Sequence, residues 1–349
     1  MKSARQSRAS VRRLSTRSQW RKHLGAIEKQ ETGHTGHTSH TGRKTLAIQD
    51  ETIGFIGLGA MGKGMAANCV RKGFELIVHD VRDEPVAELV AAGAKSAASI
   101  QELAPQCSTI ITVLPAGREV DEVIMGTDGI FAHAKPGTLI VDLSTIDPET
   151  TDKLHETATA GGFRAIDAPI GRLAWHADRG ESLFMVGGAR ADFEAIKPLL
   201  EAMGTTIHYC GQGGTGTRTK LVNNYLAIIL CQLNAEALSL SQRFGLDLAT
   251  TLDVIHGTTA TNGQLKVNWP NKVLAGDTDP GFTIDLAHKD LSLIVQAANT
   301  ARVPVPVAAA AREAFSTARS RGYGGQDFSA MVDVLCDLAQ IERAREGGG

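Results

Sequence analysis

A chain of 349 residues is long enough for two domains with separate hydrophobic cores, and this length excludes a single small domain. Lysine and arginine total 36 against 38 acidic residues, and the net charge of -2 gives no reason to expect nucleic acid or an anionic membrane as a partner. No apolar run reaches the ~18 residues that a membrane-spanning helix needs, so we expect no membrane partner either.

The first 50 residues differ in composition from the rest of the chain. They carry eleven Lys or Arg against three acids, and residues 33–44 read "GHTGHTSHTGRK". Such a segment is too poor in apolar residues to offset chain entropy, so we expect residues 1–50 to be a disordered basic tail. His34, His37 and His40 have metal-ligand spacing, but no Cys or carboxylate joins them, which favours a solvated tract. A targeting segment and a start codon assigned too far upstream both stay open.

The five cysteines are scattered and form no CxxC pair. This usage suits a reducing compartment, so we expect a cytoplasmic protein with unpaired thiols. The histidines beyond residue 50 have no Cys or His partner at ligand spacing, so we expect no metal.

From residue 53 to about 210, short apolar runs alternate with helical segments. The runs are "IGFIG", "LIVHD", "STIITVL", "TLIVDLS", "FRAIDAP" and "LFMVGG". This alternation is typical of an α/β fold with a doubly wound parallel sheet of the Rossmann type.

From residue 217 to 339 only helical periodicity remains, broken by Gly and Pro. The pattern predicts an all-α C-terminal domain, joined to the sheet by a long apolar helix over about 217–244. We place the NAD-binding domain at 51–212, the all-α substrate and dimerisation domain at 213–342, and a short disordered tail at 343–349. The domain junction is where a ligand cleft is expected.

A glycine-rich turn follows the first strand. In "IGFIGLGAMGKGMAANCV", Gly57, Gly59 and Gly62 stand in GxGxxG register at the head of a helix, where a dinucleotide pyrophosphate binds. Asp80 ends the second predicted strand, 18 residues beyond Gly62, where an acid accepts hydrogen bonds from the adenine ribose. The carboxylate would repel a 2′-phosphate and favours NAD(H). Arg82, two residues on, keeps NADP(H) open.

A polar stripe interrupts the long apolar helix. In "GGTGTRTKLVNN", Lys220, Asn223 and Asn224 lie with Ala227 at i, i+3, i+4 and i+7. We interpret Lys220 as the general acid of a carbonyl reduction and as the base of the reverse reaction, with a pKa lowered by burial. Asn224 would orient Lys220 or the substrate oxygen. A merely solvated helix face is the alternative.

Four segments in order resemble the signatures of the β-hydroxyacid dehydrogenase family: "GFIGLGAMGKGMAAN", "DAPIG", "GGTGTRTKLVNN" and "FTIDLAHKDLSL". That family includes the 3-hydroxyisobutyrate and tartronate semialdehyde enzymes and the 6-phosphogluconate dehydrogenases. The resemblance implies an enzyme with a Rossmann domain, an all-α domain, a dimeric or tetrameric assembly, and catalysis by Lys220.

The resemblance also implies the remaining site residues. The residues that would contact the cofactor are Ala60, Met61, Leu114, Pro115, Thr145 and Lys289. Of these, Lys289 would lie near the nicotinamide. Ser144 would face the substrate. Capping of the helix that "DPET" begins is the alternative role for Ser144 and Thr145.

The chain departs from the family at one turn. Most members read DAPVSGG, whereas this chain has Gly171, Arg172 and Leu173 after "DAPI". A guanidinium fork suits an anion with several equivalent oxygens, such as a sulfonate. A surface ion pair of Arg172 with Glu181 or Asp178 is the alternative.

A narrower branch of the family is similar to this chain at that turn, since its members carry "PVGR", "KLINNY" and "WPNKVL…IDLAHKDL". These enzymes reduce 3-sulfolactaldehyde to 2,3-dihydroxypropane-1-sulfonate with NADH. The resemblance implies a substrate site of Arg172, Asn223 and Gly171. A hydroxyl that the branch uses falls at Ala227 here, so succinic semialdehyde (giving 4-hydroxybutyrate) or 3-hydroxyisobutyrate stays an alternative substrate.

Two other protein classes fit less well. The family includes a chromatin-associated reader that lacks the catalytic lysine, but Lys220 is present here. The decarboxylating phosphogluconate enzymes carry a His-Asn pair where this chain has Asn223 and Asn224, and their all-α part is much longer.

Overall fold

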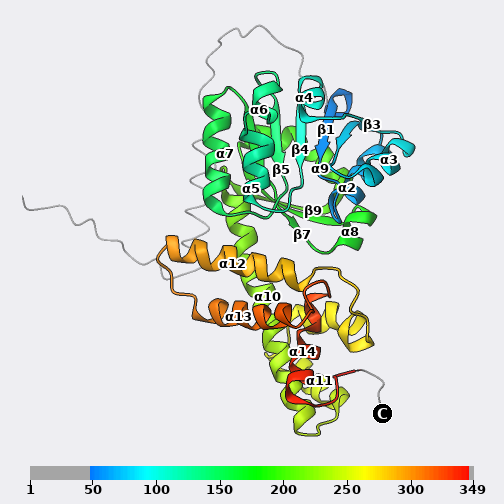
Figure 1. Ribbon diagram of the computed structural model, residues 1–349, viewed down its shortest axis with the longest axis vertical. Coiled ribbons are helices and arrows are strands. Elements are labelled where there is room, and N and C mark those ends of the chain that lie inside the picture. The colour runs from blue at the N-terminus through cyan, green and yellow to red at the C-terminus, as the bar shows by residue number, and fades with distance from the viewer. Residues whose placement is uncertain (1–47, 346–349) are drawn as a thin grey trace, which may run out of the picture. The chain divides into compact units, whose positions relative to one another are not determined.

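The computed structural model describes residues 48–345 (Figure 1). The histidine tract, most of the expected basic tail and the last four residues lie outside this range. The folded part extends slightly beyond both expected boundaries, because Ile48 is buried in a short 3-10 turn, η1 (Ile48–Asp50). At the other end Arg345 donates two hydrogen bonds, at 2.8 and 2.7 Å, to Asp333. The division between the two domains near residue 212 stays a prediction.

The first part of the chain forms one sheet, with nine strands within residues 48–345. They are β1 (Thr52–Ile56), β2 (Glu75–His79), β3 (Lys95–Ser96), β4 (Thr109–Thr112), β5 (Leu139–Asp142), β6 (Arg164–Asp167), β7 (Ile170–Gly171), β8 (Ser182–Gly188) and β9 (Gly204–Gly211). Their order is β3-β2-β1-β4-β5-β6-β8-β7, and β9 pairs with β8. The chain order reverses between β1 and β4, as in a doubly wound Rossmann sheet, which confirms the expected fold.

The sheet is mixed, whereas the sequence pattern predicted a wholly parallel one. β6 and β7 both pair antiparallel with β8, while β9 runs parallel to β8. The chain between β6 and β8 holds the two-residue β7 and one short helix, α8 (Ala174–Arg179), in place of the full helix that usually links two parallel strands.

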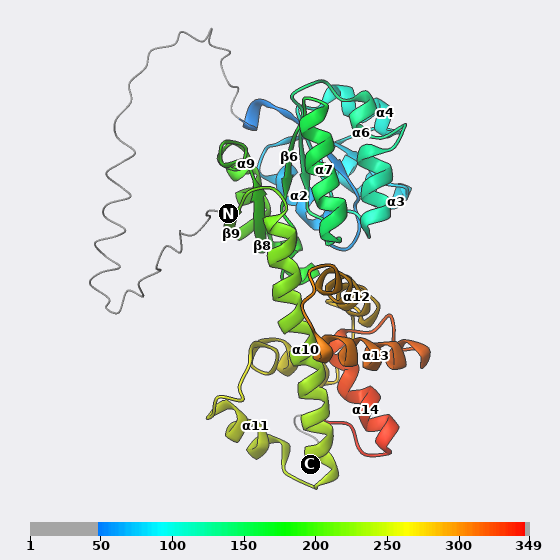
Figure 2. The same cartoon turned by 90° about the vertical axis from the view of Figure 1, so that its left-hand side faces the viewer.

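Alternate residues of the buried strands fill two different cores. Phe55, Ile111 and Val141 point to one face, where α2, α3, α8 and α9 cover the sheet. Ile110 and Ile140 point to the other, which is covered by α4 to α7 (Figures 1 and 2). Because both faces of the sheet are buried, successive strand residues must be apolar, which explains the continuous apolar runs in the sequence.

The helices around the sheet are short to medium in length. Their bounds are α2 (Gly62–Arg71), α3 (Asp83–Ala91), α4 (Ile100–Leu103), α5 (Gly117–Val120), α6 (Ile130–His133), α7 (Pro148–Ala160) and α9 (Arg190–Met203), with the single turns η2 (Ala104–Gln106) and η3 (Asp121–Met125).

The C-terminal part is all helical and is built on α10 (Thr215–Arg243), which confirms the long helix expected from the sequence. The others are α11 (Leu248–His256), η4 (Gln264–Asn268), η5 (Trp269–Asn271), η6 (Val273–Ala275), α12 (Ile284–Thr300), α13 (Pro306–Ser320), η7 (Phe328–Ala330) and α14 (Met331–Ala339). Figure 2 shows α12, α13 and α14 along one side of α10 and α11 on the other. Trp269 and Phe315 are fully buried in the core that they share. Among residues 48–345, no helix is both long and apolar enough to cross a bilayer.

Candidate functional site

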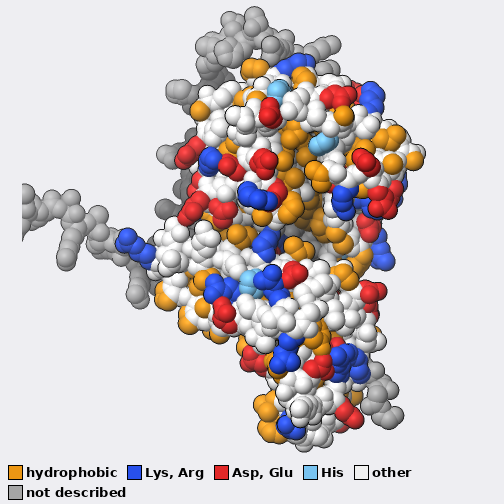
Figure 3. Space-filling model, viewed as in Figure 1, with side chains coloured by type: hydrophobic (Ala, Val, Ile, Leu, Met, Phe, Trp, Pro, Cys, Tyr) orange, Lys and Arg blue, Asp and Glu red, His pale blue; other side chains and the backbone are white. Residues whose placement is uncertain are grey.

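A cavity of about 180 Å³ lies where the carboxyl ends of the central strands approach α10 and α12. On the face that Figure 3 shows, apolar side chains gather around a hollow above α12. Ligand pockets usually measure ~300 to 1,000 Å³, so this one is small. Of the residues expected from the sequence, it brings together Ala60, Met61, Leu114, Pro115, Ser144, Thr145, Arg172, Lys220 and Lys289. It does not include Gly171, Asn223 or Asn224.

The glycine turn after β1 leads into α2, and two of its residues, Ala60 and Met61, line the cavity. Gly57 has a φ of +92°, and a Cβ there would approach the Val113 carbonyl oxygen to 2.2 Å. Gly62 lies so close to the same turn that a Cβ would come within 2.0 Å of the Gly57 carbonyl oxygen. At Gly59, by contrast, no atom lies within 4 Å of such a Cβ. Two glycines are therefore required by the fold itself, and the third leaves open space beside a helix N-terminus, which fits a pyrophosphate.

Asp80, directly after β2, is joined to this turn. Its Oδ2 accepts a hydrogen bond of 2.6 Å from the Leu58 N–H. Its Oδ1 accepts from the Arg82 N–H at 2.9 Å, and the Arg82 side chain lies 3.3 Å away. The Arg82 guanidinium also donates to the Leu58 carbonyl oxygen. These hydrogen bonds hold the pKa of Asp80 below its usual value despite the opposing effect of burial, so a carboxylate stands where a ribose would bind.

Lys220 lies near the beginning of α10 and is buried, with 8% of the residue's surface exposed. Its ammonium donates a hydrogen bond of 2.6 Å to the carbonyl oxygen of Ile170, on β7. Burial lowers the pKa of Lys220 to about 8; nearby Asp290 opposes this change and Lys289 adds to it. The lysine therefore exchanges protons near neutral pH, as a general acid or base must.

Asn224 lies one helical turn after Lys220 on α10 and does not line the cavity. Its Nδ2 donates to Asp290 Oδ2 at 2.6 Å, and its Oδ1 accepts from Asn223 Nδ2 at 3.0 Å. Asn223 is exposed to solvent, although the sequence placed it on the same face as Lys220. Positions i+3 and i+4 lie on opposite flanks of position i, so only one of the two asparagines is directed inward.

Lys289 connects α12 with the loops after β4 and β5. Its ammonium donates to the Thr145 carbonyl oxygen at 2.8 Å and to that of Pro115 at 3.3 Å. It also lies 3.1 Å from Asp290 Oδ1, a contact that is ionic rather than a well-directed hydrogen bond. The ammonium thus holds the helical part against the sheet at the cavity wall.

Ser144 is buried and already committed to other protein groups. Its hydroxyl donates to Asp142 Oδ1 at 2.6 Å and accepts from the Leu114 N–H at 2.9 Å. Complete burial raises the pKa of Asp142 to about 6. The helix that follows, α7, is capped by Asp147, which accepts from the Thr150 N–H, so helix capping is not the role of Ser144 or Thr145.

Arg172 adopts an unusual backbone conformation, with a φ of +74°. Its guanidinium donates to Thr205 Oγ1 at 3.0 Å, to Thr206 Oγ1 at 2.9 Å and to the carbonyl oxygen of Glu181. Among residues 48–345 it makes no ion pair with a carboxylate, so the pairing with Glu181 or Asp178 that the sequence left open is wrong.

The sequence reasoning missed several residues of this region. Asp290 and Phe282 line the cavity but were not singled out. Asp290 follows Lys289 directly, and this position beside a predicted site residue was the available signal. Thr205 and Thr206 gave no local signal, because their partner Arg172 lies 33 and 34 residues away in the chain. Asp142 bonds to Ser144, two residues on, but also to Thr112, 30 residues away.

The geometry is that of an oxidoreductase with a dinucleotide turn on one side of a small cavity and a buried lysine on the other. Comparison with protein families agrees. Residues 52–211 match the NAD binding domain of 6-phosphogluconate dehydrogenase. Residues 214–335 match the NAD-binding domain of NADP-dependent 3-hydroxyisobutyrate dehydrogenase.

Similar proteins cover most of the chain. A 3-sulfolactaldehyde reductase of Escherichia coli is 43% identical over 283 residues, which are 81% of this chain and 95% of that protein. The mitochondrial 3-hydroxyisobutyrate dehydrogenase of Mus musculus is 35% identical over 81% of this chain and 86% of its own length. A Mycobacterium tuberculosis 3-hydroxyisobutyrate dehydrogenase solved with L-serine superposes with a TM-score of 0.75, at 29% identity over 82% of this chain and 99% of that one.

The chain therefore belongs to the β-hydroxyacid dehydrogenase family of 3-hydroxyisobutyrate dehydrogenase-like enzymes. It is an NAD(P)-dependent dehydrogenase or reductase whose substrates are small hydroxyacids or the corresponding aldehydes.

Proposed function

We propose that the protein reduces 3-sulfolactaldehyde to 2,3-dihydroxypropane-1-sulfonate with NADH, reversibly. The observation that carries this proposal is the presence of buried Lys220 and of Arg172 in the wall of one cavity. A lysine with a pKa of about 8 supplies the proton, and an arginine offers a fork for an anionic group. The 43% identical relative that bears the name of this activity supports the same choice.

Lys220 is the proposed proton donor. The coenzyme, when bound, supplies the hydride that adds to the aldehyde carbon. The Lys220 ammonium gives one proton to the carbonyl oxygen, which becomes the hydroxyl. In the reverse direction the neutral amine accepts that proton. Asn224, held by Asp290, is the proposed orienting group for the lysine or for the substrate oxygen.

NAD(H) is the proposed coenzyme, bound by the glycine turn, by Asp80 and by the loop and helix residues Ala60, Met61, Leu114, Pro115, Thr145 and Lys289. The support is local to Asp80. Its carboxylate would repel a 2′-phosphate, and the Arg82 guanidinium is engaged with Asp80 and with the Leu58 carbonyl. Arg82 is therefore already paired in the resting structure, which weakens the main argument for NADP(H).

Arg172, with Gly171, Ser144 and Asn223, is the proposed site of the sulfonate. A side chain in the left-handed backbone region costs about 1 kcal/mol or more relative to glycine. Related enzymes carry glycine in this turn, so the arginine is kept at a conformational cost. This cost favours a role for its side chain in binding. The guanidinium must leave Thr205 and Thr206 to point its fork at a substrate.

Ala227 favours a second candidate activity. Without a hydroxyl at this position one hydrogen bond to a sulfonate is missing, which would cost about 1 kcal/mol. A carboxylate substrate would lose less binding free energy from the missing hydroxyl. Oxidation of 4-hydroxybutyrate to succinic semialdehyde, or of 3-hydroxyisobutyrate, is therefore the alternative.

The experiment is a substrate panel in the oxidative direction. Purified protein is given NAD or NADP with 2,3-dihydroxypropane-1-sulfonate, 4-hydroxybutyrate, 3-hydroxyisobutyrate or glycerate. We expect the highest kcat/KM with NAD and the sulfonate. If the sulfonate ranks among the poorest substrates, the proposed activity is wrong.

Arg172→Gly separates a binding role from a structural one. Loss of a charged hydrogen-bond donor should raise KM for the sulfonate by about tenfold to hundredfold. Thermal stability should not fall by much, because glycine relieves the backbone strain. Thr206→Val is the matched control, since it breaks a resting contact but keeps the guanidinium. An unchanged KM in Arg172→Gly would contradict the proposed clamp.

An oligomer and a cytoplasmic location complete the proposal. Val222, Leu226, Leu233 and Leu240 of α10, and Phe244 at its C-cap, are all exposed apolar side chains. They recur at steps of four and seven residues, so they form a stripe suited to a second copy in a homodimer or homotetramer. All five cysteines are unpaired, and four are buried, which suits a reducing compartment.

A further inference from the structure

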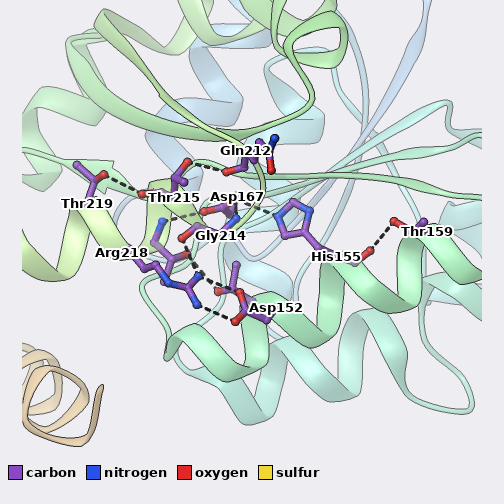
Figure 4. A network of polar contacts seen from close by, with 12 residues as sticks. Asp152, His155, Thr159, Asp167, Gln212, Gly214, Thr215, Arg218 and Thr219 are labelled. Carbon is purple, nitrogen blue, oxygen red and sulfur yellow. Dashed lines mark hydrogen bonds and ion pairs between the residues drawn. The ribbon is translucent and has the colours of Figure 1, made fainter. Parts of the chain in front are cut away.

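A buried carboxylate at the end of β6 holds the beginning of α10. Asp167 is 1% exposed, and its Oδ1 accepts from the Gly214 N–H at 2.7 Å. Its Oδ2 accepts from the Thr217 N–H at 2.8 Å. These two amides belong to the first turn of the helix that carries Lys220, as Figure 4 shows for Gly214.

The arrangement is a helix cap supplied from a distant part of the chain. The first four N–H groups of a helix have no partner inside it, and the N-terminus attracts negative charge. The N-terminal residue Gly214 has no side chain to offer as a cap. Asp167 lies 47 residues before Gly214, so the cap joins the helix to the sheet rather than only ending it.

A histidine of α7 completes the cap. His155 Nε2 lies 2.9 Å from Asp167 Oδ1, and the hydroxyls of Thr151 and Thr217 lie 3.1 Å apart (Figure 4 shows the histidine). The carboxylate is therefore held between α7 and α10, with three donors in a nearly dry environment. Removal of one partner of such a buried group is costly.

The same segment of the chain contacts α10 a second time. Three residues after Asp167, the Ile170 carbonyl oxygen accepts the hydrogen bond from the Lys220 ammonium. Lys220 is in turn three residues after Thr217. One short stretch, 167–170, therefore fixes both the backbone of this helix turn and the ammonium at the end of the side chain.

We propose that Asp167, oriented by His155, is a positioning residue for proton transfer by Lys220. It sets where the lysine lies along the cavity wall and keeps the surroundings of the ammonium closed to water. The inference rests on the proposed role of Lys220 as proton donor. Asp167 acts only through α10 and does not touch the substrate.

The first test is Asp167→Asn, which keeps the shape but turns one acceptor into a donor facing the helix amides. A shift of a reacting group by about 1 Å costs about a hundredfold in rate, so we expect kcat to fall by about this factor. The KM for NAD should stay close to that of the unaltered protein, because Asp167 hydrogen-bonds to none of the residues proposed to bind the coenzyme. An unchanged kcat overturns the proposal.

The second readout is the pH dependence of alcohol oxidation, which needs the neutral amine and so rises through the pKa of Lys220. Asp290 and Lys289 from α12 and Arg172 from the turn after β7 are the charged groups near it. Loosening α10 admits water, reduces the desolvation of the ammonium, and should move the rise to higher pH. A variant that is less stable but has an unmoved pH profile would show a purely structural role and overturn the proposal.

Substitutions at His155 test the same positioning role while the Asp167 carboxylate is kept. His155→Gln retains a donor for Asp167 and should behave nearly like the unaltered protein. His155→Leu removes the donor, and we expect a lower kcat and the same displacement of the pH profile. This pair keeps the proposal testable if Asp167→Asn does not fold, and equal behaviour of the two variants overturns it.

Two controls separate this inference from the proposed function. Asp152→Asn breaks the exposed 2.7 Å ion pair between Asp152 of α7 and Arg218, which follows Thr217 on α10. This variant should leave kcat and the pH profile unchanged. Lys220→Ala is measured in parallel. If it retains turnover, the proposed proton donor is wrong. If it loses turnover while Asp167→Asn does not, only the positioning role is wrong.

Discussion

The two halves of the site are built in different ways. The proposed coenzyme half depends mainly on main-chain geometry within residues 52–80: close-packed glycines, a helix N-terminus, and one carboxylate bonded to the Leu58 N–H. The proposed substrate half brings together side chains from separated segments, around Ser144, Arg172 and Lys220. Substitutions on the substrate side therefore change chemistry and specificity, whereas those at the close-packed Gly57 and Gly62 act first on the fold.

The largest expected effect is on the substrate side, in Lys220→Met. General acid or base catalysis contributes ~10² to 10⁴ in rate, and we expect kcat to fall by about 10³ while NADH binding persists. Stopped-flow or steady-state turnover and an NADH fluorescence titration measure the two quantities. Undiminished turnover would contradict a catalytic lysine.

The same substitution should stabilise the protein at neutral pH. The pKa of Lys220 is about 8 when folded, against 10.5 when unfolded. Below pH 8 both states carry the charge, and the folded state bears the cost of burying it. Between these two values the unfolded state holds more protons, so the stability of the unaltered protein rises with pH. We expect Lys220→Met to be more stable by about 2 kcal/mol at pH 7, with the gain disappearing towards pH 10.5. Urea unfolding of both proteins at several pH values checks the sign.

The next effect concerns the coenzyme side and compares two alanine substitutions three residues apart. Gly62→Ala would place a methyl group 2.0 Å from the Gly57 carbonyl oxygen, which is backbone and cannot move aside. We expect a loss of about 3 kcal/mol in the free energy of unfolding. Gly59→Ala meets no protein atom within 4 Å, so folding should be unaffected, while NADH affinity falls by about tenfold or more. Calorimetry and an NADH titration distinguish them, and equal unfolding temperatures would refute the steric argument.

The smallest effect returns to the substrate side. Ala227→Ser restores a hydroxyl one turn beyond Asn223, and one added hydrogen bond of about 1 kcal/mol should lower KM for the sulfonate about fivefold. The KM for 4-hydroxybutyrate should change less. Comparison of kcat/KM for the two alcohols is the measurement, and an equal change for both would argue against a sulfonate site near this position.

The coenzyme half could be predicted from the sequence because its signals are local. The glycine spacing, Asp80 and the apolar strands all depend on residues near them in the chain. The long helix α10 was also predictable from its length and periodicity. The antiparallel direction of β8 was not, because the helix that precedes it, α8, has only six residues and β7 has only two.

The substrate half was predicted only as a set of residues, not as an arrangement. Lys220 was found, but its partner Ile170 is 50 residues away, and the Asp290 that holds Asn224 is 66 residues away. Arg172 was recognised as unusual by its chemistry, yet its resting contacts with Thr205 and Thr206 depend on how β9 lies beside β8. Long-range pairings of this kind leave no periodicity in the sequence.

The left-handed backbone at residue 172 offers a practical route to new specificities. Every side chain that is not β-branched meets a similar conformational penalty there, so Arg, Lys, Gln and His variants would differ in chemistry more than in folding. A set of variants at residue 172 would therefore compare how different side chains bind an oxyanion while the rest of the fold stays nearly constant. Glycine at this position would serve as the reference without backbone strain.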